Sequence, residues 1–293
     1  MKTLGLDLGG TKIAAAVVEN GKILGKTRIA TPQDGFESVV DALESSSRTL
    51  LAEHPDIEAV GVGSPGPLDL RKGIILFAPN IPNMENAPIV SALSTRLGKK
   101  VVLENDANAA GYAEHLYGAA HDLDNSIYIT ISTGIGGGIF VRDTIVHGAS
   151  GAAGEVGHMT LLPDGPLCGC GHYGCWESVA SGRAIAREAR FSYREELTTE
   201  EVFKRAQLGE RKALKIIDNA ARFTGLGLAN LQKAFDPDGF VIGGGMSQAG
   251  SFYLDKIKAA ADEHCTDFPS VLVRVAELGT DAGVIGAAAV ALS

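Results

Sequence analysis

The sequence has little of several features that would otherwise define its class. Cysteine occurs four times and tryptophan once among 293 residues, so a small fold held together by disulfide bonds is excluded. No uncharged apolar run approaches the roughly 18 residues that a membrane-spanning helix needs. The N-terminus lacks the apolar core of a signal peptide, because Asp7 and Lys12 interrupt it. These absences predict a soluble protein of the cytosol.

Basic residues are also in short supply. The chain has 26 Lys and Arg against 35 Asp and Glu, a net charge of −9, and no block of Lys or Arg is longer than two residues. Nucleic acids and anionic membranes attract proteins mainly through clustered positive charge, so we expect neither as a partner. The length predicts one large domain or two ordinary ones.

Glycine is the residue in excess. It accounts for 37 of the 293 residues, about 13% against about 7% in average proteins. The glycines cluster directly after apolar runs, where they allow the backbone to approach a ligand closely. Clusters of this kind commonly bind phosphate through backbone amides.

Apolar runs rich in β-branched residues alternate with segments of helical periodicity, which is typical of an α/β fold. We expect strands at 3–8, 59–63, 100–103, 126–132, 239–243 and 271–275. Helices are expected at 36–53, 88–97, 107–117, 182–190, 199–208, 211–235 and 252–264, with a last one from about residue 282.

Two glycine- and threonine-containing turns, each between two strands, lie about 125 residues apart. Their repetition suggests two related halves that share a nucleotide. A third glycine cluster ends the expected strand at 239–243 and suits the approach to an adenine ring. Plain hairpins and a tight strand-to-helix turn are the alternatives. The candidate ATP- and Mg²⁺-binding residues are Asp7, Gly9, Gly10, Thr11, Lys12, Thr133, Gly134, Gly136, Gly137, Gly138, Gly244 and Gly245.

Three of the four cysteines lie within eight residues and predict a zinc site. Together with His158, residues Cys168, Cys170 and Cys175 supply a Cys₃His ligand set. Four protein ligands make such a site structural rather than catalytic. His172 is an alternative fourth ligand, and Cys265 is expected to be a packing residue.

Four further polar residues are candidates for the chemistry. Glu155 and Glu177 lie beside the zinc ligands, which would hold both carboxylates rigidly enough to accept hydrogen bonds from vicinal hydroxyls. Asn105 and Asp106 follow the strand at 100–103, at the strand end where α/β sheets bind ligands. Asp106 is our candidate general base. Solvated glutamates and a helix N-cap at Asp106 are the alternatives.

Taken together, these motifs resemble the ROK family of sugar kinases, repressors and related open reading frames, within the actin-like and hexokinase-like ATPase superfamily. The resemblance spans the chain and includes the complete Cys-x-Cys-Gly-x-x-Gly-Cys-x-Glu pattern typical of the bacterial glucokinases of this family. The segments that carry it are 7–12, 63–66, 104–108, 132–138, 155–158, 168–177 and 241–245.

This resemblance implies an ATP-dependent transfer of phosphate, with Mg²⁺, to the 6-hydroxyl of a hexose. Glucose is the first choice, and fructose, mannose, N-acetylglucosamine, N-acetylmannosamine or a broad hexokinase specificity are alternatives. Asp106 would take the hydroxyl proton. The other sugar-binding candidates are Gly66, Asn80, Asn105, Glu155, His158 and Glu177.

The resemblance also implies an actin-like fold of two α/β domains around a cleft, with a structural zinc loop. We expect a small domain at 1–116 plus 281–293, a large domain at 117–280, and a dimer or tetramer. Repressors of the family carry a DNA-binding segment before the first glycine motif, which here begins at Gly5. A kinase is therefore expected rather than a sugar-sensing repressor.

Overall fold

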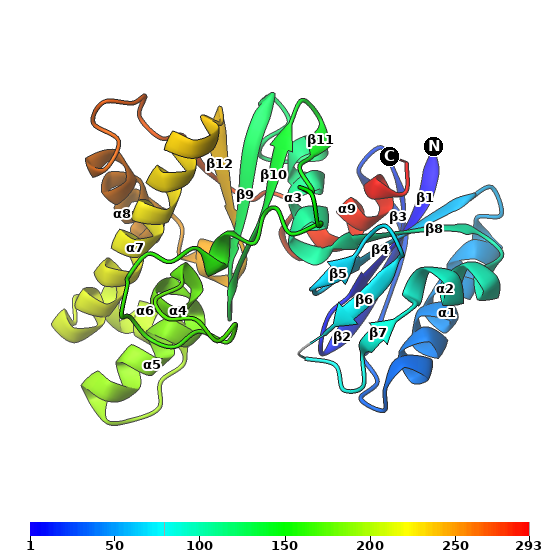
Figure 1. Ribbon diagram of the computed structural model, residues 1–293, viewed down its shortest axis with the longest axis horizontal. Coiled ribbons are helices and arrows are strands. Elements are labelled where there is room, and N and C mark those ends of the chain that lie inside the picture. The colour runs from blue at the N-terminus through cyan, green and yellow to red at the C-terminus, as the bar shows by residue number, and fades with distance from the viewer. Residues whose placement is uncertain (79, 293) are drawn as a thin grey trace. The chain divides into compact units, whose positions relative to one another are not determined.

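The computed structural model describes residues 1–78 and 80–292 and has the predicted α/β composition (Figure 1). The chain forms two compact units. Unit 1 consists of Met1–Asp122, Gly138–Ala153 and Glu277–Ser293, and unit 2 of Leu123–Gly137 and Gly154–Ala276. This division differs from the expected domains chiefly in assigning 138–153 to unit 1.

The main sheet of unit 1 brings the ends of three parallel strands to one edge. Its strand order is β3 (Lys22–Ala30), β2 (Lys12–Glu19), β1 (Lys2–Leu8), β4 (Ala59–Ser64) and β8 (Lys100–Asn105). In the parallel part, Asp7 of β1 pairs with Gly63 of β4, which in turn pairs with Glu104 of β8. The register therefore aligns the first glycine motif with the segment that contains Asp106.

Both faces of this sheet are buried because apolar residues occupy both sides of β2. Ile13, Ala15 and Val17 belong to a core with α1 (Phe36–Glu53) and α2 (Ile89–Leu97). The alternate residues Ala14, Ala16 and Val18 pack with α3 (Asp106–Tyr117) and α9 (Ala282–Val290). Successive strand residues point to opposite faces, so the two helix pairs cover opposite sides of the sheet.

Helix α9 lies directly against β1 and β4. A Cβ atom added at Gly5 would come within 2.0 Å of the Val284 carbonyl oxygen, and one at Gly61 within 1.7 Å of the Ala287 carbonyl oxygen. Thr3 Oγ1 also donates to the Ala288 carbonyl at 2.8 Å. Only glycine allows this close approach of helix to sheet, which docks the last helix onto the first strand.

Residues 138–153 belong to unit 1 because their side chains pack on it. The Phe140 ring stacks on Tyr112 and His115 of α3, with ring centroids 6.1 and 5.3 Å apart.

Unit 1 also contains a small sheet that the sequence did not predict, because its strands are too short to show alternation. Its strands are β5 (Leu68–Asp69), β6 (Ile74–Phe77) and β7 (Glu85–Ala87).

The second main sheet has the order β11 (Thr144–Ile145), β10 (Ile135–Val141), β9 (Asn125–Ile131), β12 (Gly239–Gly243) and β13 (Val273–Val275). In unit 2, α7 packs against α4, α6 and α8. The helices of this unit are α4 (Trp176–Ala180), α5 (Gly182–Tyr193), α6 (Thr199–Gln207), α7 (Arg211–Phe235) and α8 (Ser251–Glu263), and the 3₁₀ turns η1 (Val156–His158) and η2 (Gly245–Ala249) complete it.

The expected helices are confirmed to within a few residues, and α1 and α7 match their predicted bounds. A third 3₁₀ turn, η3 (Gly279–Asp281), leads into α9.

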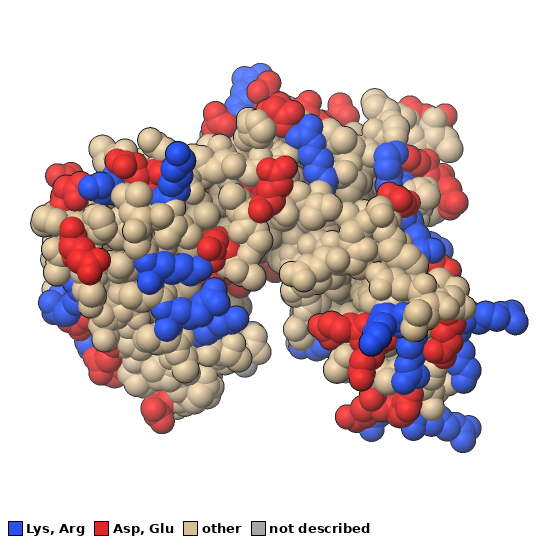
Figure 2. Space-filling model, turned by 180° about the vertical axis from the view of Figure 1, so that it is seen from behind, with Lys and Arg blue, Asp and Glu red and all other residues tan. Residues whose placement is uncertain are grey.

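Within residues 1–78 and 80–292, no helix combines the length and apolar character needed to cross a bilayer. Acidic and basic side chains are interspersed on the face drawn in Figure 2.

Candidate functional site

In unit 1, the turn between β1 and β2 contains Gly9, Gly10 and Thr11 and is fixed through its carbonyl groups. Thr31 Oγ1 donates to the Gly9 carbonyl at 2.7 Å, and Gln33 Nε2 donates to the Gly10 carbonyl at 3.1 Å. A Cβ atom at Gly10 would lie 2.6 Å from Cβ of Asn80, so Asn80 packs on this turn. The first glycine motif and Asn80 are thus neighbours within one unit.

Asp7 lies at the end of β1, immediately before this turn. Burial raises the pKa of its carboxyl group to about 6, and the charge of Asp106 contributes to the increase. A Cβ atom at Gly283, near the start of α9, would be 2.9 Å from Asp7 Oδ2. The carboxylates of Asp7 and Asp106 therefore influence each other at the same edge of the sheet.

The turn from β8 into α3 resolves the alternative reading of Asp106. Asn105 is the N-cap, because its Oδ1 accepts from the amides of Ala107 at 2.9 Å and Asn108 at 3.2 Å. Asp106 is the first residue of the helix and is half-buried. A Cβ atom at Gly66 would lie 3.6 Å from Asn105 Nδ2, so three predicted sugar-site residues gather here.

In unit 2, the turn between β9 and β10 forms one wall of a pocket of about 740 Å³. The amides of Gly182 and Arg183 donate to the carbonyls of Ser132 and Thr133, at 2.8 and 3.3 Å, which docks the start of α5 on the turn. Other walls come from α6 and η2. The lining residues are Ser132, Thr133, Gly182, Arg183, Ala186, Thr198, Thr199, Glu200, Phe203, Lys204, Gln207, Gly245, Met246, Gln248 and Ala249.

The glycines of this unit divide into those at the pocket and those inside the fold. Gly245 lines the pocket and donates its amide to Ser132 Oγ at 3.1 Å. A Cβ atom at Gly244 would be 2.4 Å from the Ile131 carbonyl oxygen, and packing on β9 accounts for that glycine. Gly136 and Gly137 of unit 2, and the following Gly138 of unit 1, lie within β10 rather than in the turn. Their contact with a nucleotide stays a prediction.

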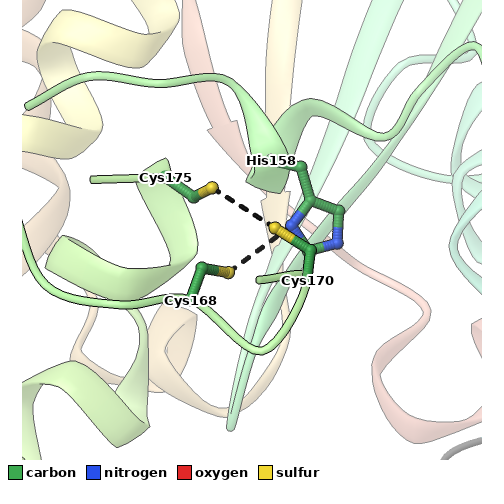
Figure 3. Close-up of side chains that lie close together, drawn as sticks. All are labelled: His158, Cys168, Cys170 and Cys175. Carbon is green, nitrogen blue, oxygen red and sulfur yellow. Dashed lines mark hydrogen bonds between the residues drawn. The ribbon is translucent and has the colours of Figure 1, made fainter. Parts of the chain in front are cut away.

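The four predicted metal ligands lie together, with His158 at the end of η1 and the three cysteines in the loop that leads to α4 (Figure 3). Their ligand atoms are all within 4.8 Å of one another. Cys170 Sγ and Cys175 Sγ are 3.6 Å apart, as are Cys168 Sγ and His158 Nδ1. Two sulfurs bound tetrahedrally to zinc are separated by about 3.8 Å, so the cluster fits a zinc ion in composition and size.

His158 uses its two ring nitrogens differently. Nδ1 faces the cysteines, and Nε2 lies 3.9 Å from Oε2 of Glu155. His172 Nδ1 is 3.7 Å from Cys170 Sγ, but the four mutually close donors include His158 instead. One ring can therefore serve the metal through Nδ1 while Nε2 lies near Glu155.

Glu177 connects the metal loop to the pocket. It follows Cys175 by two residues, in the first turn of α4, whose Trp176 is fully buried. Its Oε2 accepts from the Ile135 amide at 2.9 Å, and its Oε1 accepts from Arg183 Nη2 at 2.9 Å. Both carboxylate oxygens therefore hold the β9–β10 turn and the start of α5.

We expect the substitution Glu177→Gln to raise the KM for MgATP by about 5- to 20-fold, because it weakens the support of the turn at Ile135. Initial rates with MgATP and sugar varied separately measure the effect. Glu195→Gln, which removes an exposed carboxylate paired with Arg205 at 2.8 Å, is the matched control. An increase confined to the KM for sugar would instead support the predicted contact of Glu177 with a hydroxyl.

The sequence reasoning missed the contribution of α5 and α6 to the pocket. Arg183 and Lys204 bring positive charge to its lining. The amphipathic pattern of these helices predicted their burial but gave no signal for the exposed residues. The predicted sugar-binding residues divide between the units: Gly66, Asn80, Asn105 and Asp106 lie in unit 1, and Glu155, His158 and Glu177 in unit 2.

Comparison with known proteins gives consistent matches over the whole chain. Residues 3–293 match the model of the ROK family. A glucokinase of Streptomyces coelicolor is 39% identical, with 98% of this chain and 96% of the relative covered. An N-acetylmannosamine kinase of Haemophilus influenzae is 36% identical, with 98% and 94% covered. The structure of a ROK family glucokinase from Streptomyces griseus, in complex with glucose and AMPPNP, is 38% identical with a TM-score of 0.86, covering 100% of this chain and 99% of that one.

Proposed function

Because the chain belongs to the ROK family, we propose that it is an ATP-dependent hexose kinase that phosphorylates the 6-hydroxyl of glucose. The observation that carries the proposal is the edge of unit 1 at which Asp7 and Asp106 influence each other while Asn105 caps α3. Because Asn105 is the N-cap of α3, the helix does not depend on Asp106 as its cap, which supports the role of Asp106 as general base. The similarity to glucokinases favours glucose as the sugar.

In the proposed reaction, Asp106 accepts the proton of the 6-hydroxyl as that oxygen forms a bond to the γ-phosphorus of ATP. The bond from phosphorus to the β–γ bridging oxygen breaks, which gives the sugar 6-phosphate and ADP. Phosphoryl transfer has a loose transition state in most analyses, so a weak and well-placed base is sufficient. Asn80, Asn105, Glu155 and Glu177 would orient the sugar through its other hydroxyls.

Two metals accompany this proposal. Asp7 is the carboxylate that would hold the hydrated Mg²⁺ accompanying ATP, and this ion would supply positive charge for the phosphates. His158, Cys168, Cys170 and Cys175 would hold a structural Zn²⁺. Lys12 and the glycines beside it would contact phosphate oxygens. The pocket of unit 2, of about 740 Å³, has room for a nucleoside. A homodimer or homotetramer remains our expectation for the assembly.

The proposal is tested by ADP release from MgATP with glucose, mannose, fructose, N-acetylglucosamine and N-acetylmannosamine. We expect kcat/KM to be at least tenfold higher for glucose than for each other sugar. Comparable values on several sugars would indicate a broad hexokinase. Release with N-acetylmannosamine alone would establish the second candidate, which the 36% identity to such a kinase favours. No release with any sugar, from folded and zinc-loaded protein, would contradict the proposed function.

A further inference from the structure

The carboxylate of Glu104, next to the proposed base, is buried and holds the start of α3. Its side chain is 2% exposed. Oε1 accepts from the Asn105 amide at 2.8 Å and from Asn108 Nδ2 at 2.9 Å. These two bonds attach the residues on both sides of Asp106 to one carboxylate oxygen. The orientation of Asp106 therefore depends on where Glu104 is held.

His147 holds the other oxygen of this carboxylate. Its Nε2 lies 2.6 Å from Glu104 Oε2, and His147 is the only ion-pair partner of Glu104 among residues 1–78 and 80–292. An ionised carboxylate has no proton to donate, so the hydrogen of this bond belongs to the imidazole. Glu104 raises the pKa of His147 through this bond, and the short distance is typical of a charge-assisted contact.

The loop that carries His147 is fixed on both sides of this residue. The Val146 amide donates to the Ile139 carbonyl at 2.9 Å, and the Ala153 amide donates to the His147 carbonyl at 3.1 Å. Arg71 Nη2 donates to the Ala149 carbonyl, two residues after His147, at 3.3 Å. The imidazole is thus directed at Glu104 by a backbone that has its own support.

We infer that His147 is a positioning residue for Asp106 and acts through Glu104. This inference rests on the proposed function. The imidazolium compensates the buried charge of Glu104 and sets the position of its carboxylate. Glu104 then fixes the Asn105 amide and the Asn108 side chain, and with them the first turn of α3. A displacement of about 1 Å at a reacting group can cost about 100-fold in rate, so this indirect support has a measurable effect on turnover.

The inference predicts a specific pH dependence. Because the pKa of His147 is raised above its usual value near 6.5, the imidazolium pair is complete below that pH. The ion pair is lost as the pH rises through the raised value, and only a hydrogen bond from the neutral imidazole to the Glu104 carboxylate remains, without the attraction between opposite charges. We therefore expect kcat to fall on the alkaline side, with a midpoint above about 6.5.

The experiment compares wild type, His147→Ala, His147→Gln and His264→Ala, the last removing an exposed histidine at the end of α8. We expect His147→Ala to lower kcat by about 10- to 100-fold, with a KM for MgATP within about twofold of wild type. His147→Gln supplies a neutral donor and should recover part of the lost kcat without the alkaline decline. His264→Ala should retain both the wild-type rate and the wild-type pH profile.

Several outcomes would overturn the inference. One is a wild-type kcat that stays constant from pH 6 to pH 9; another is a His147→Ala variant with wild-type kinetics. Equal losses in the Ala and Gln variants, accompanied only by lower thermal stability, would show a purely structural role. If His147→Ala does not fold, the wild-type profile and the Gln variant decide the question. Failure of the proposed function is a separate result, because then wild type itself releases no ADP with any sugar.

Discussion

Replacing Asp106 by asparagine is expected to lower kcat by about 10²- to 10⁴-fold, the usual contribution of a general base. Asparagine has nearly the same size as aspartate but cannot accept the hydroxyl proton. The cap of α3 is made by Asn105, so the substitution leaves the helix start intact. The affinity for sugar should change by less than about threefold, because the other hydroxyl-binding candidates remain. Steady-state rates and calorimetric titration with glucose measure the two quantities.

Asp255→Asn is the control for this experiment, since Asp255 is an exposed carboxylate on α8 in unit 2. It should keep the wild-type kcat and sugar affinity. Near-normal turnover in Asp106→Asn would refute the assignment of the base. A large loss of sugar affinity with unchanged kcat would make Asp106 a binding residue instead.

The second large effect is expected at the metal cluster. Cys170→Ser should abolish stoichiometric zinc binding, lower Tm by several degrees and raise the KM for sugar by at least tenfold. The loop from η1 to α4, which lies wholly within the described residues, contains no helix or strand; two isolated β-bridges, between Thr160 and Cys175 and between Leu167 and Tyr173, and backbone hydrogen bonds such as that from the Leu161 amide to the Gly174 carbonyl connect it. Structural zinc sites contribute folding energy directly, so without the metal this loop loses much of what fixes Glu155 and His158.

Cys265→Ser is the control, because Cys265 lies in unit 2 away from the cluster; unlike the exposed Cys170 it is buried, with its Sγ 3.9 Å from the Ala229 carbonyl. It should keep one zinc per chain and wild-type kinetics. Metal content, thermal unfolding and sugar kinetics are measured on all three proteins. A Cys170→Ser variant with wild-type zinc content and kinetics would contradict both the ligand set and its role in holding the sugar-binding residues.

Helices and strands were predictable from the sequence where the segment is long enough for its pattern of apolar and polar residues to repeat. Helix α7 extends over 25 residues and has its predicted bounds. The strands β5 to β7 have at most four residues each, too few for alternation to show. Hydrophobic periodicity therefore predicts long helices and strands better than short ones.

The candidate site was predictable where chemistry depends on rare residue types at fixed spacing. The metal cluster is such a case, because cysteine is scarce and its ligands are close in sequence. The pair of Glu104 and His147 was not, since 43 residues separate the partners and neither has an unusual neighbour. The assignment of the N-cap to Asn105 rather than Asp106 also required backbone angles that adjacent, equally suitable residues do not reveal.

The docking of α9 onto β1 determines when unit 1 can finish folding during synthesis. Thr3 donates a hydrogen bond to the carbonyl of Ala288, which is synthesised 285 residues later. Until then, α3 alone covers one face of the first sheet, and Gly5 and Gly61 lack the helix that packs on them. Unit 1 thus cannot complete its fold before α9 has been synthesised, and a chain that stops before residue 277 should depend on chaperones and be degraded rapidly.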